Sequence, residues 1–185
     1  GLQPLATEPG YLQSFSLFDV KVESLSVSLD GERISDEKLA MASTMKQVDW
    51  DQDSLVTLHV VGASDDMRTV VSKANQQGGA HLVLVDPAHE QWFKRYRDYF
   101  AQGLRKRDGE ETGAIVLVLS EQPAPEHFSV QGSTIKTKRQ LSNVVGVLPG
   151  RSKSNEIVLY SAHYDHLGAM GEGEDTIYNG ADDDA

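Results

Sequence analysis

The sequence contains no cysteine among its 185 residues. The chain therefore has no disulfide framework and no thiolate metal site, so any bound metal must be held by His, Asp and Glu. Aromatic residues are few, at 7%, while the hydrophobic share is 39%. This composition is typical of a soluble globular protein with a modest core.

Positive charge and long apolar runs are also scarce. The 17 Lys and Arg residues face 28 Asp and Glu residues, which gives a net charge of −11. Lys136, Lys138 and Arg139 are too few to indicate nucleic-acid binding against this charge. No apolar run reaches the roughly 20 residues needed to cross a bilayer.

No basic, apolar signal segment stands at the start of the chain. The sequence opens at Gly1-Leu2-Gln3-Pro4, so a signal could have been removed together with residues upstream. The location that we expect is secreted or periplasmic.

A strand–helix–strand unit is predicted over residues 55–85. Leu55–Val61 is a β-rich run, and residues 80–85 form a second short apolar run. Between them, apolar residues recur at helical spacing after an expected N-cap at Ser64 and stop at Gly78-Gly79. The unit favours a right-handed βαβ crossover.

Further strands are predicted on both sides of this unit. Alternation from Phe15 to Leu29 indicates a strand pair, or one long bent strand that ends in a turn. Ala114–Leu119 is a third apolar strand. Residues 128–132 and 136–148 are predicted as two separate strands.

A second helix is predicted after Pro87. Four aromatic residues share one of its faces: Trp92, Tyr96, Tyr99 and Phe100. We interpret this face most simply as part of the core; the alternative is an aromatic wall beside a substrate cleft.

Four histidines of the middle chain are not expected to bind metal. His59 and His81 lie within apolar strand patterns, which indicates structural roles. His89 and His127 are predicted to be exposed loop residues.

The last part of the sequence holds the residues that are best suited to bind a metal ion. Ile157–Tyr160 is an apolar run that predicts a buried strand, followed by His163 and Asp165. Open α/β sheets bind ligands at the C-terminal ends of their strands. A neutral imidazole is a good zinc ligand, and a nearby carboxylate can fix its tautomer.

An acidic triplet, Asp182-Asp183-Asp184, follows this stretch. Three adjacent carboxylates repel one another unless they are solvated or neutralised by a cation. Alone the triplet would indicate a solvated loop or a helix cap, but beside His163 it indicates a carboxylate that bridges two metal ions. A calcium-binding loop over residues 172–184 is the alternative, although His163 suits a softer ion.

These two motifs carry a family resemblance. Ser161–Gly168, followed by Asn179–Ala185, resembles the co-catalytic zinc aminopeptidases of metallopeptidase family twenty-eight, which include bacterial leucyl aminopeptidases and aminopeptidase Y. Asn143–Gly150 resembles the family strand that precedes the first motif. The resemblance is specific because both motifs occur in the family's order and spacing.

The resemblance implies a two-zinc site that acts on peptides with a free N-terminus. His163 would ligate one zinc, Asp165 would orient His163, and Asp183 would bridge both zincs. His166 would shape the nearby loop. The general-base Glu and the remaining ligands are expected beyond Ala185, so the chain is expected to be a fragment without activity of its own.

The resemblance also predicts the fold class, which is α/β. Residues 1–25 would form the N-terminal edge of a peptidase domain, and residues 133–185 the first strands of its three-layer α/β/α fold. Residues 26–132 resemble, more loosely, the protease-associated domain inserted in such enzymes, which implies a lid over the substrate. The rival hypothesis is a non-catalytic interaction module for which residues 140–185 are only a tether.

Overall fold

The computed structural model describes residues 1–107, 109–121, 124–153 and 156–163. The chain divides into two compact units, one formed by residues 12–144 and the other by residues 1–11 with the chain from 145 onward. The first unit is mixed α/β, mostly strands with two helices. The predicted α/β class is therefore confirmed, whereas the predicted domain boundaries at 26 and 132 stay predictions.

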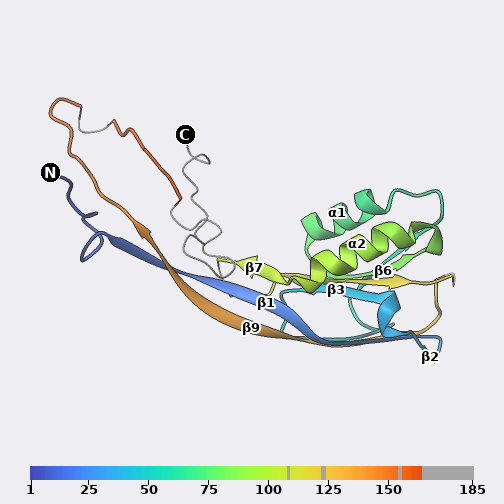
Figure 1. Ribbon diagram of the computed structural model, residues 1–185. Helices are drawn as coiled ribbons and strands as arrows, with labels where there is room; N and C mark the ends of the chain where they lie inside the picture. Colours follow the sequence, from blue (N-terminus) through green and yellow to red (C-terminus); the bar gives the residue numbers. More distant parts are fainter. Residues whose placement is uncertain (108, 122–123, 154–155, 164–185) are drawn as a thin grey trace, which may run out of the picture. The chain divides into compact units, whose positions relative to one another are not determined.

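The elements of the 12–144 unit are shown in Figure 1. Its strands and helices are β1 Leu12–Leu29, β2 Glu32–Arg33, β3 Leu39–Ser43, β4 Gln47–Asp51, β5 Thr57–Val61, α1 Met67–Gln77, β6 Gly79–Val85, α2 Glu90–Ala101, β7 Leu104–Lys106, β8 Gly113–Leu119 and β9 Phe128–Val144. Two short 3-10 helices cover Asp36–Lys38 and Pro87–His89.

The strands form two sheets. In the first sheet the order is β2-β1-β9-β4, with β7 also paired to β1, and all its pairs are antiparallel. In the second sheet the order is β3-β8-β6-β5. There β5, β6 and β8 are parallel, while β3 runs antiparallel to β8. The strand–helix–strand unit predicted over residues 55–85 is confirmed as β5, α1 and β6.

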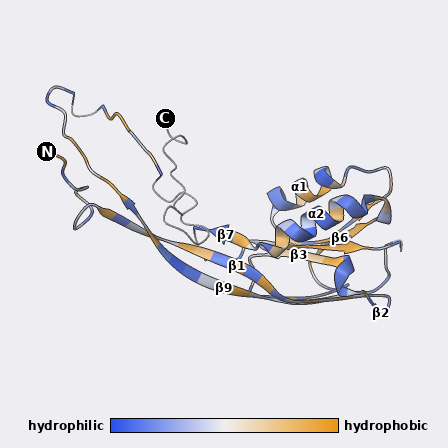
Figure 2. Cartoon of the chain, viewed as in Figure 1, coloured by the Kyte–Doolittle hydropathy of each residue, from blue (hydrophilic) through white to orange (hydrophobic). Residues whose placement is uncertain are grey.

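The side chains of β6 and β8 are buried on both faces of the second sheet. Leu82 and Leu84 belong to one hydrophobic core, whereas Val83 and Val85 belong to the other. This explains why β6 is a continuous apolar run rather than an alternating one, as the colouring in Figure 2 shows.

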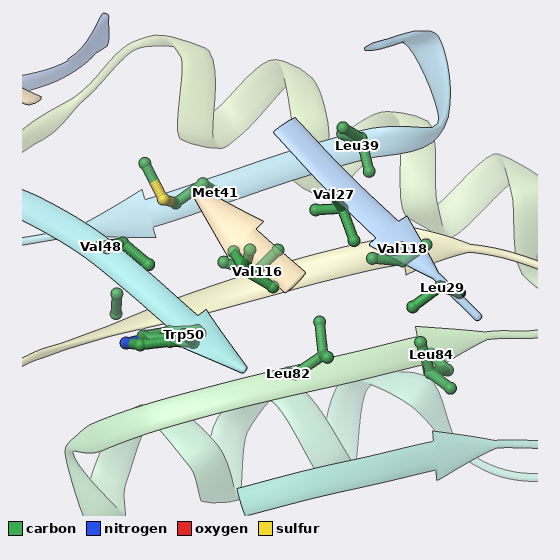
Figure 3. Packing of buried hydrophobic residues seen from close by; sticks show 12 residues of the cluster. Val27, Leu29, Leu39, Met41, Val48, Trp50, Leu82, Leu84, Val116 and Val118 are labelled. Atoms are coloured by element: carbon green, nitrogen blue, oxygen red, sulfur yellow. The ribbon is translucent and has the colours of Figure 1, made fainter. Parts of the chain in front are cut away.

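One core lies between the two sheets (Figure 3). Val27 and Leu29 of β1, with Trp50 of β4, face Leu82 and Val116 of the second sheet. On this side β4 alternates strictly between exposed and buried residues, because only one of its faces is covered.

The other core lies between the second sheet and the helices. Its helical members are Met67, Val71 and Ala74 of α1, and Phe93 and Phe100 of α2. The predicted aromatic face of α2 is therefore wrong in part. Phe93 is 1% exposed and is the main anchor, whereas Tyr99 is 60% exposed.

Helix α1 begins two residues later than the expected Ser64 cap implies. Its N-cap is Asp66, whose carboxylate accepts a hydrogen bond from the backbone N–H of Arg68 at 3.1 Å. The carboxylate of Asp65 instead accepts from the N–H of Gly62. The predicted end of the helix at Gly78-Gly79 is confirmed, since both glycines have positive φ.

Strands β1 and β9 are longer than any other element. They pair in antiparallel register from Leu12↔Val144 to Leu29↔Phe128, with one irregularity between Val22 and Ser24. Of the two possibilities left open for Phe15–Leu29, the long bent strand is therefore the correct one. The two strands predicted at 128–132 and 136–148 are one strand, because β1 supplies a single continuous partner across the gap.

Gly113 occupies a position that no other residue fits without strain. Its φ is +150°, and a Cβ built there would lie 2.1 Å from the carbonyl oxygen of Gly79 on the neighbouring strand. Thr44 fixes the same crossing, because its hydroxyl accepts hydrogen bonds from the N–H groups of Thr112 and Gly113 at 2.8 and 3.1 Å.

Replacing Gly113 with Ala is expected to lower the free energy of unfolding by about 3 kcal/mol or more, because β6 and β8 must separate to admit the methyl group. Gly79→Ala is the matched control, since Gly79 has φ +86° and open space around it. The control should lose only about 1–2 kcal/mol from backbone strain. Equal losses in urea unfolding would show that the close approach is not the cause.

Candidate functional site

His163 is the one predicted site residue that the structure describes. It lies at the end of residues 156–163, which contain no helix or strand, and its side chain is exposed. The segment belongs to the second compact unit. The His163 side chain is therefore accessible to solvent.

The predicted buried strand at 156–160 is wrong for this structure. Ile157 is 88% exposed and Tyr160 is 90% exposed, and Val158 and Leu159 between them are similarly open. A strand is held by hydrogen bonds to a neighbouring strand. None of the described residues supplies such a neighbour here.

The residues that lead to this segment are held by the N-terminal segment of the same unit. Gln3 and Val147 exchange backbone hydrogen bonds of 2.8 and 2.7 Å, and the N–H of Val145 donates to the carbonyl of Tyr11 at 2.8 Å. The side chain of Leu2 packs close to Gly146. The stretch that resembles a family strand, Asn143–Gly150, therefore has an ordered antiparallel partner over part of its length.

Asp165, His166, Asp182, Asp183 and Asp184 lie outside the described residues. Within residues 1–107, 109–121, 124–153 and 156–163, no three His, Asp or Glu side chains group so as to hold a metal ion. The donor set proposed from the sequence, an imidazole and carboxylates without thiolates, still matches the chemistry of a zinc site.

Comparison with known proteins bears on this same stretch. Residues 143–185 match the model of Peptidase family M28. The match begins at the end of β9 and includes His163 and both motifs of the sequence resemblance. It supports a metallopeptidase-related function for this part of the chain, and a peptidase family implies a peptide substrate. No curated protein and no solved structure matches the chain.

The M28 match covers less than a quarter of the chain, so the 12–144 unit must be described from its own structure. Neither of its helices is long and apolar enough to span a membrane in the described part. The remaining candidate groups are its histidines and its cavities.

His59 and His81 form a pair on adjacent strands. The Nε2 atom of His59 lies 3.0 Å from Nδ1 of His81, and Nε2 of His81 lies 2.7 Å from the carbonyl oxygen of Gly78. His81 is 3% exposed. Because the His81 ring can donate one proton to Gly78 and accept one from His59, both of its nitrogens are hydrogen-bonded in the neutral pair, which supports the predicted structural roles.

Of the other two histidines, His127 is exposed as predicted, whereas His89 is not. His127 is exposed, as predicted, and its N–H donates to Asp30 at 2.8 Å. His89 is half-buried in a 3-10 helix, and its Nε2 lies 3.0 Å from the carbonyl oxygen of Gly62. The predicted exposure of His89 is wrong, because that ring packs against the turn that follows β5.

A cavity of about 240 Å³ opens between α1 and α2. Tyr96, Tyr99 and Phe100 form one wall, and small residues such as Ala74 and Ala114 leave the space unfilled. Part of the predicted aromatic face of α2 therefore lines a hollow rather than the core. The sequence pattern does not indicate this hollow, because small residues from distant segments create it together.

Trp92 has a further role that the sequence did not indicate. The guanidinium carbons of Arg68 and Arg95 lie 5.0 and 4.7 Å from the centroid of its ring. Arg68 belongs to α1 and Arg95 to α2, so this contact joins the two helices.

The pH dependence of stability is expected to involve His59. Partial burial, and then the nearby His81, hold its pKa below the usual 6.5. The unfolded chain therefore binds this proton more readily, so stability is lost as pH falls through about 6.5. His59→Gln should reduce the loss that urea unfolding measures between about pH 7.5 and 5.5.

His127→Gln is the control for that measurement, because His127 is exposed. It should leave the pH dependence unchanged. If His59→Gln lost as much stability at low pH as the unsubstituted chain, His59 would not be the source of that loss.

Proposed function

We propose that this chain is part of a zinc-dependent aminopeptidase that removes N-terminal residues from peptides. The observation that carries the proposal is the M28 match over residues 143–185, because that segment contains His163 and Asp183. Peptides with a free N-terminus are the proposed substrates, and a secreted or periplasmic location is proposed with them.

The proposed roles follow the chemistry of each side chain. His163 would donate an imidazole lone pair to one zinc, and Asp165 would accept a hydrogen bond from the other ring nitrogen and hold the tautomer. Asp183 would neutralise and bridge two zinc ions. The ions, when bound, supply a water of lowered pKa for attack on the scissile carbonyl.

We also propose that these 185 residues alone do not hydrolyse peptides. A catalytic zinc ordinarily has three protein ligands and an open position. His163 and Asp183 are the two zinc ligands that the family resemblance assigns within these 185 residues. The chemistry of the donor set fits zinc, but its number of ligands is too small.

Residues 26–132 are proposed to act as a protease-associated-like insert that controls substrate access. Two features support an insert. The residues of the 12–144 unit have two hydrophobic cores of their own. Ser26 and Gln131, at and next to the ends of the proposed insert, are paired neighbours on β1 and β9. A unit whose ends lie side by side can be inserted into a host domain without disturbing it.

The rival function is a non-catalytic interaction module, and the same self-contained fold favours it. Under this hypothesis the insert is the functional part and the M28 segment is a tether. Zinc binding and hydrolysis distinguish the two hypotheses.

Zinc titration of the 185-residue chain should give weak binding, roughly micromolar or weaker, because two ligands hold the ion. His163→Ala and Asp183→Ala should each abolish it, and His127→Ala should not. Tight, stoichiometric binding would contradict the incomplete site, and binding that survives both substitutions would remove His163 and Asp183 as ligands.

In an active polypeptide that contains this segment, His163→Ala is expected to lower kcat on a leucine anilide by about a thousandfold or more. Circular dichroism should stay unchanged, because His163 is exposed and outside both cores. Hydrolysis at the original rate would reject the aminopeptidase assignment and leave the interaction module.

A further inference from the structure

Among the described residues, no strand pairs with the outer edge of β9 over about half of its length. Residues 129–133 lie between β1 and β4, but from Ile135 to Leu141 the only strand that pairs with β9 among the described residues is β1. Figure 1 shows β1 and β9 running side by side beyond the helices. The N–H and C=O groups of such an edge alternate toward the open side.

Neither hydrophobic core extends to this part of the two strands. The buried members that β1 and β9 supply to these cores are Val27, Leu29 and Val130, all at the other end of the pairing, although Val20, opposite Lys136, is also buried. Here Ile135 is 53% exposed and Leu141 is 40% exposed. Short β7 adds a third strand beside β1 at residues 18–20, but no described strand pairs with the other side of β9 from Ile135 to Leu141. An added strand there would widen this narrow sheet and stabilise it.

Positive charge is concentrated on this ribbon. Seven of the 17 cationic residues lie on β1, β7, β9 or next to β7: Lys21, Arg105, Lys106, Arg107, Lys136, Lys138 and Arg139. In register, Phe18 lies opposite Lys106 on one side and Lys138 on the other. Figure 2 shows the resulting hydrophilic stretch in the middle of β9. We call the part of β1, β7 and β9 that carries these seven residues the basic ribbon.

The carboxylates near the basic ribbon do not neutralise its positive charge. Asp19 accepts from Nε of Arg105 at 3.0 Å and forms an ion pair with Arg139 at 2.5 Å, so one carboxylate serves two guanidinium groups. The Arg105 hydrogen bond lowers the pKa of Asp19, which therefore stays ionised. The guanidinium side chains remain 64% and 62% exposed.

Neighbouring acids are fewer than the cations. Glu23 accepts a hydrogen bond from Ser133. Asp108, Glu110 and Glu111 follow β7 in the sequence, so that with Asp19 and Glu23 five acids stand against seven cations. The ammonium of Lys136 is held 2.6 Å from the carbonyl oxygen of Gly109. That contact involves a neutral acceptor, so the charge of Lys136 is not cancelled.

We propose that the edge of β9 from Ile135 to Leu141 binds an extended acidic segment of a partner polypeptide as an added strand. Backbone hydrogen bonds would supply the pairing, and Lys136, Lys138 and Arg139 would contact carboxylates on the two faces of the added strand. Charge complementarity selects this partner, because a second copy of β9 would bring like charges together. The open strand edge favours a polypeptide over nucleic acid or an anionic membrane, because only a polypeptide backbone can pair with it as a strand.

The test uses the 185-residue chain and a fluorescent octapeptide that alternates Thr and Glu, acetylated at its N-terminus. Fluorescence anisotropy should show saturable binding that weakens as NaCl is raised, because the charge pairs are exposed. Hydrogen exchange of the amides in 135–141 should slow on binding. An octapeptide of Thr and Lys should not bind.

Two variants separate charge from backbone pairing. Lys136→Glu with Lys138→Glu should weaken binding on the order of tenfold or more, since attraction becomes repulsion. Lys38→Glu with Lys73→Glu, both exposed outside the ribbon, should leave it unchanged. A peptide N-methylated at alternate residues should fail to bind, because it cannot donate those backbone hydrogen bonds.

Three results would overturn the proposal. In the first, the N-methylated peptide binds as tightly as the unmodified peptide. In the second, the Lys38/Lys73 control variant loses as much affinity as the Lys136/Lys138 variant. In the third, heparin or phosphatidylserine vesicles bind and the acidic peptide does not. The first would leave only a charged surface, and the last would assign the ribbon to a polyanion or a membrane.

Discussion

The two-sided burial of β6 and β8 is the constraint on which the 12–144 unit depends. Leu82 and Val83 are adjacent in sequence and point to opposite faces, yet both are fully buried. Each such side chain contributes roughly 1.5–3 kcal/mol when it leaves water. Both faces of the sheet must therefore be covered, and this requirement places α1 and α2 on one side and β1, β4 and β9 on the other.

Strands β1 and β9 cover the second sheet with only one half of their length, the half that contains Val27, Leu29 and Val130. Val27, Leu29 and Val130 close the core between the sheets, whereas the half from Ile135 onward carries charge and contributes to neither core. The same two strands bring Leu12 next to Val144. The chain therefore enters and leaves the unit through this pair of strands, which also carries an open strand edge among the described residues.

The chemistry of the chain is separated along the sequence. The described histidines of the 12–144 unit make structural hydrogen bonds, as the His59–His81 pair does, or lie exposed, as His127 does. The M28 match and the candidate ligands His163 and Asp183 fall almost wholly outside that unit. This separation is consistent with a peptidase segment joined to a module that holds no metal site in its described residues.

The sequence by itself determined the βαβ unit, because periodicity and glycine stops are local properties of Leu55–Val85. It also determined the M28 resemblance, which rests on residue types at fixed spacing. Tertiary structure alone decided that β9 is one strand and that Phe93 anchors α2. It likewise decided that Ile157–Tyr160 lies exposed. Each of these depends on which distant segment lies opposite, and an apolar run forms a buried strand only where such a partner exists.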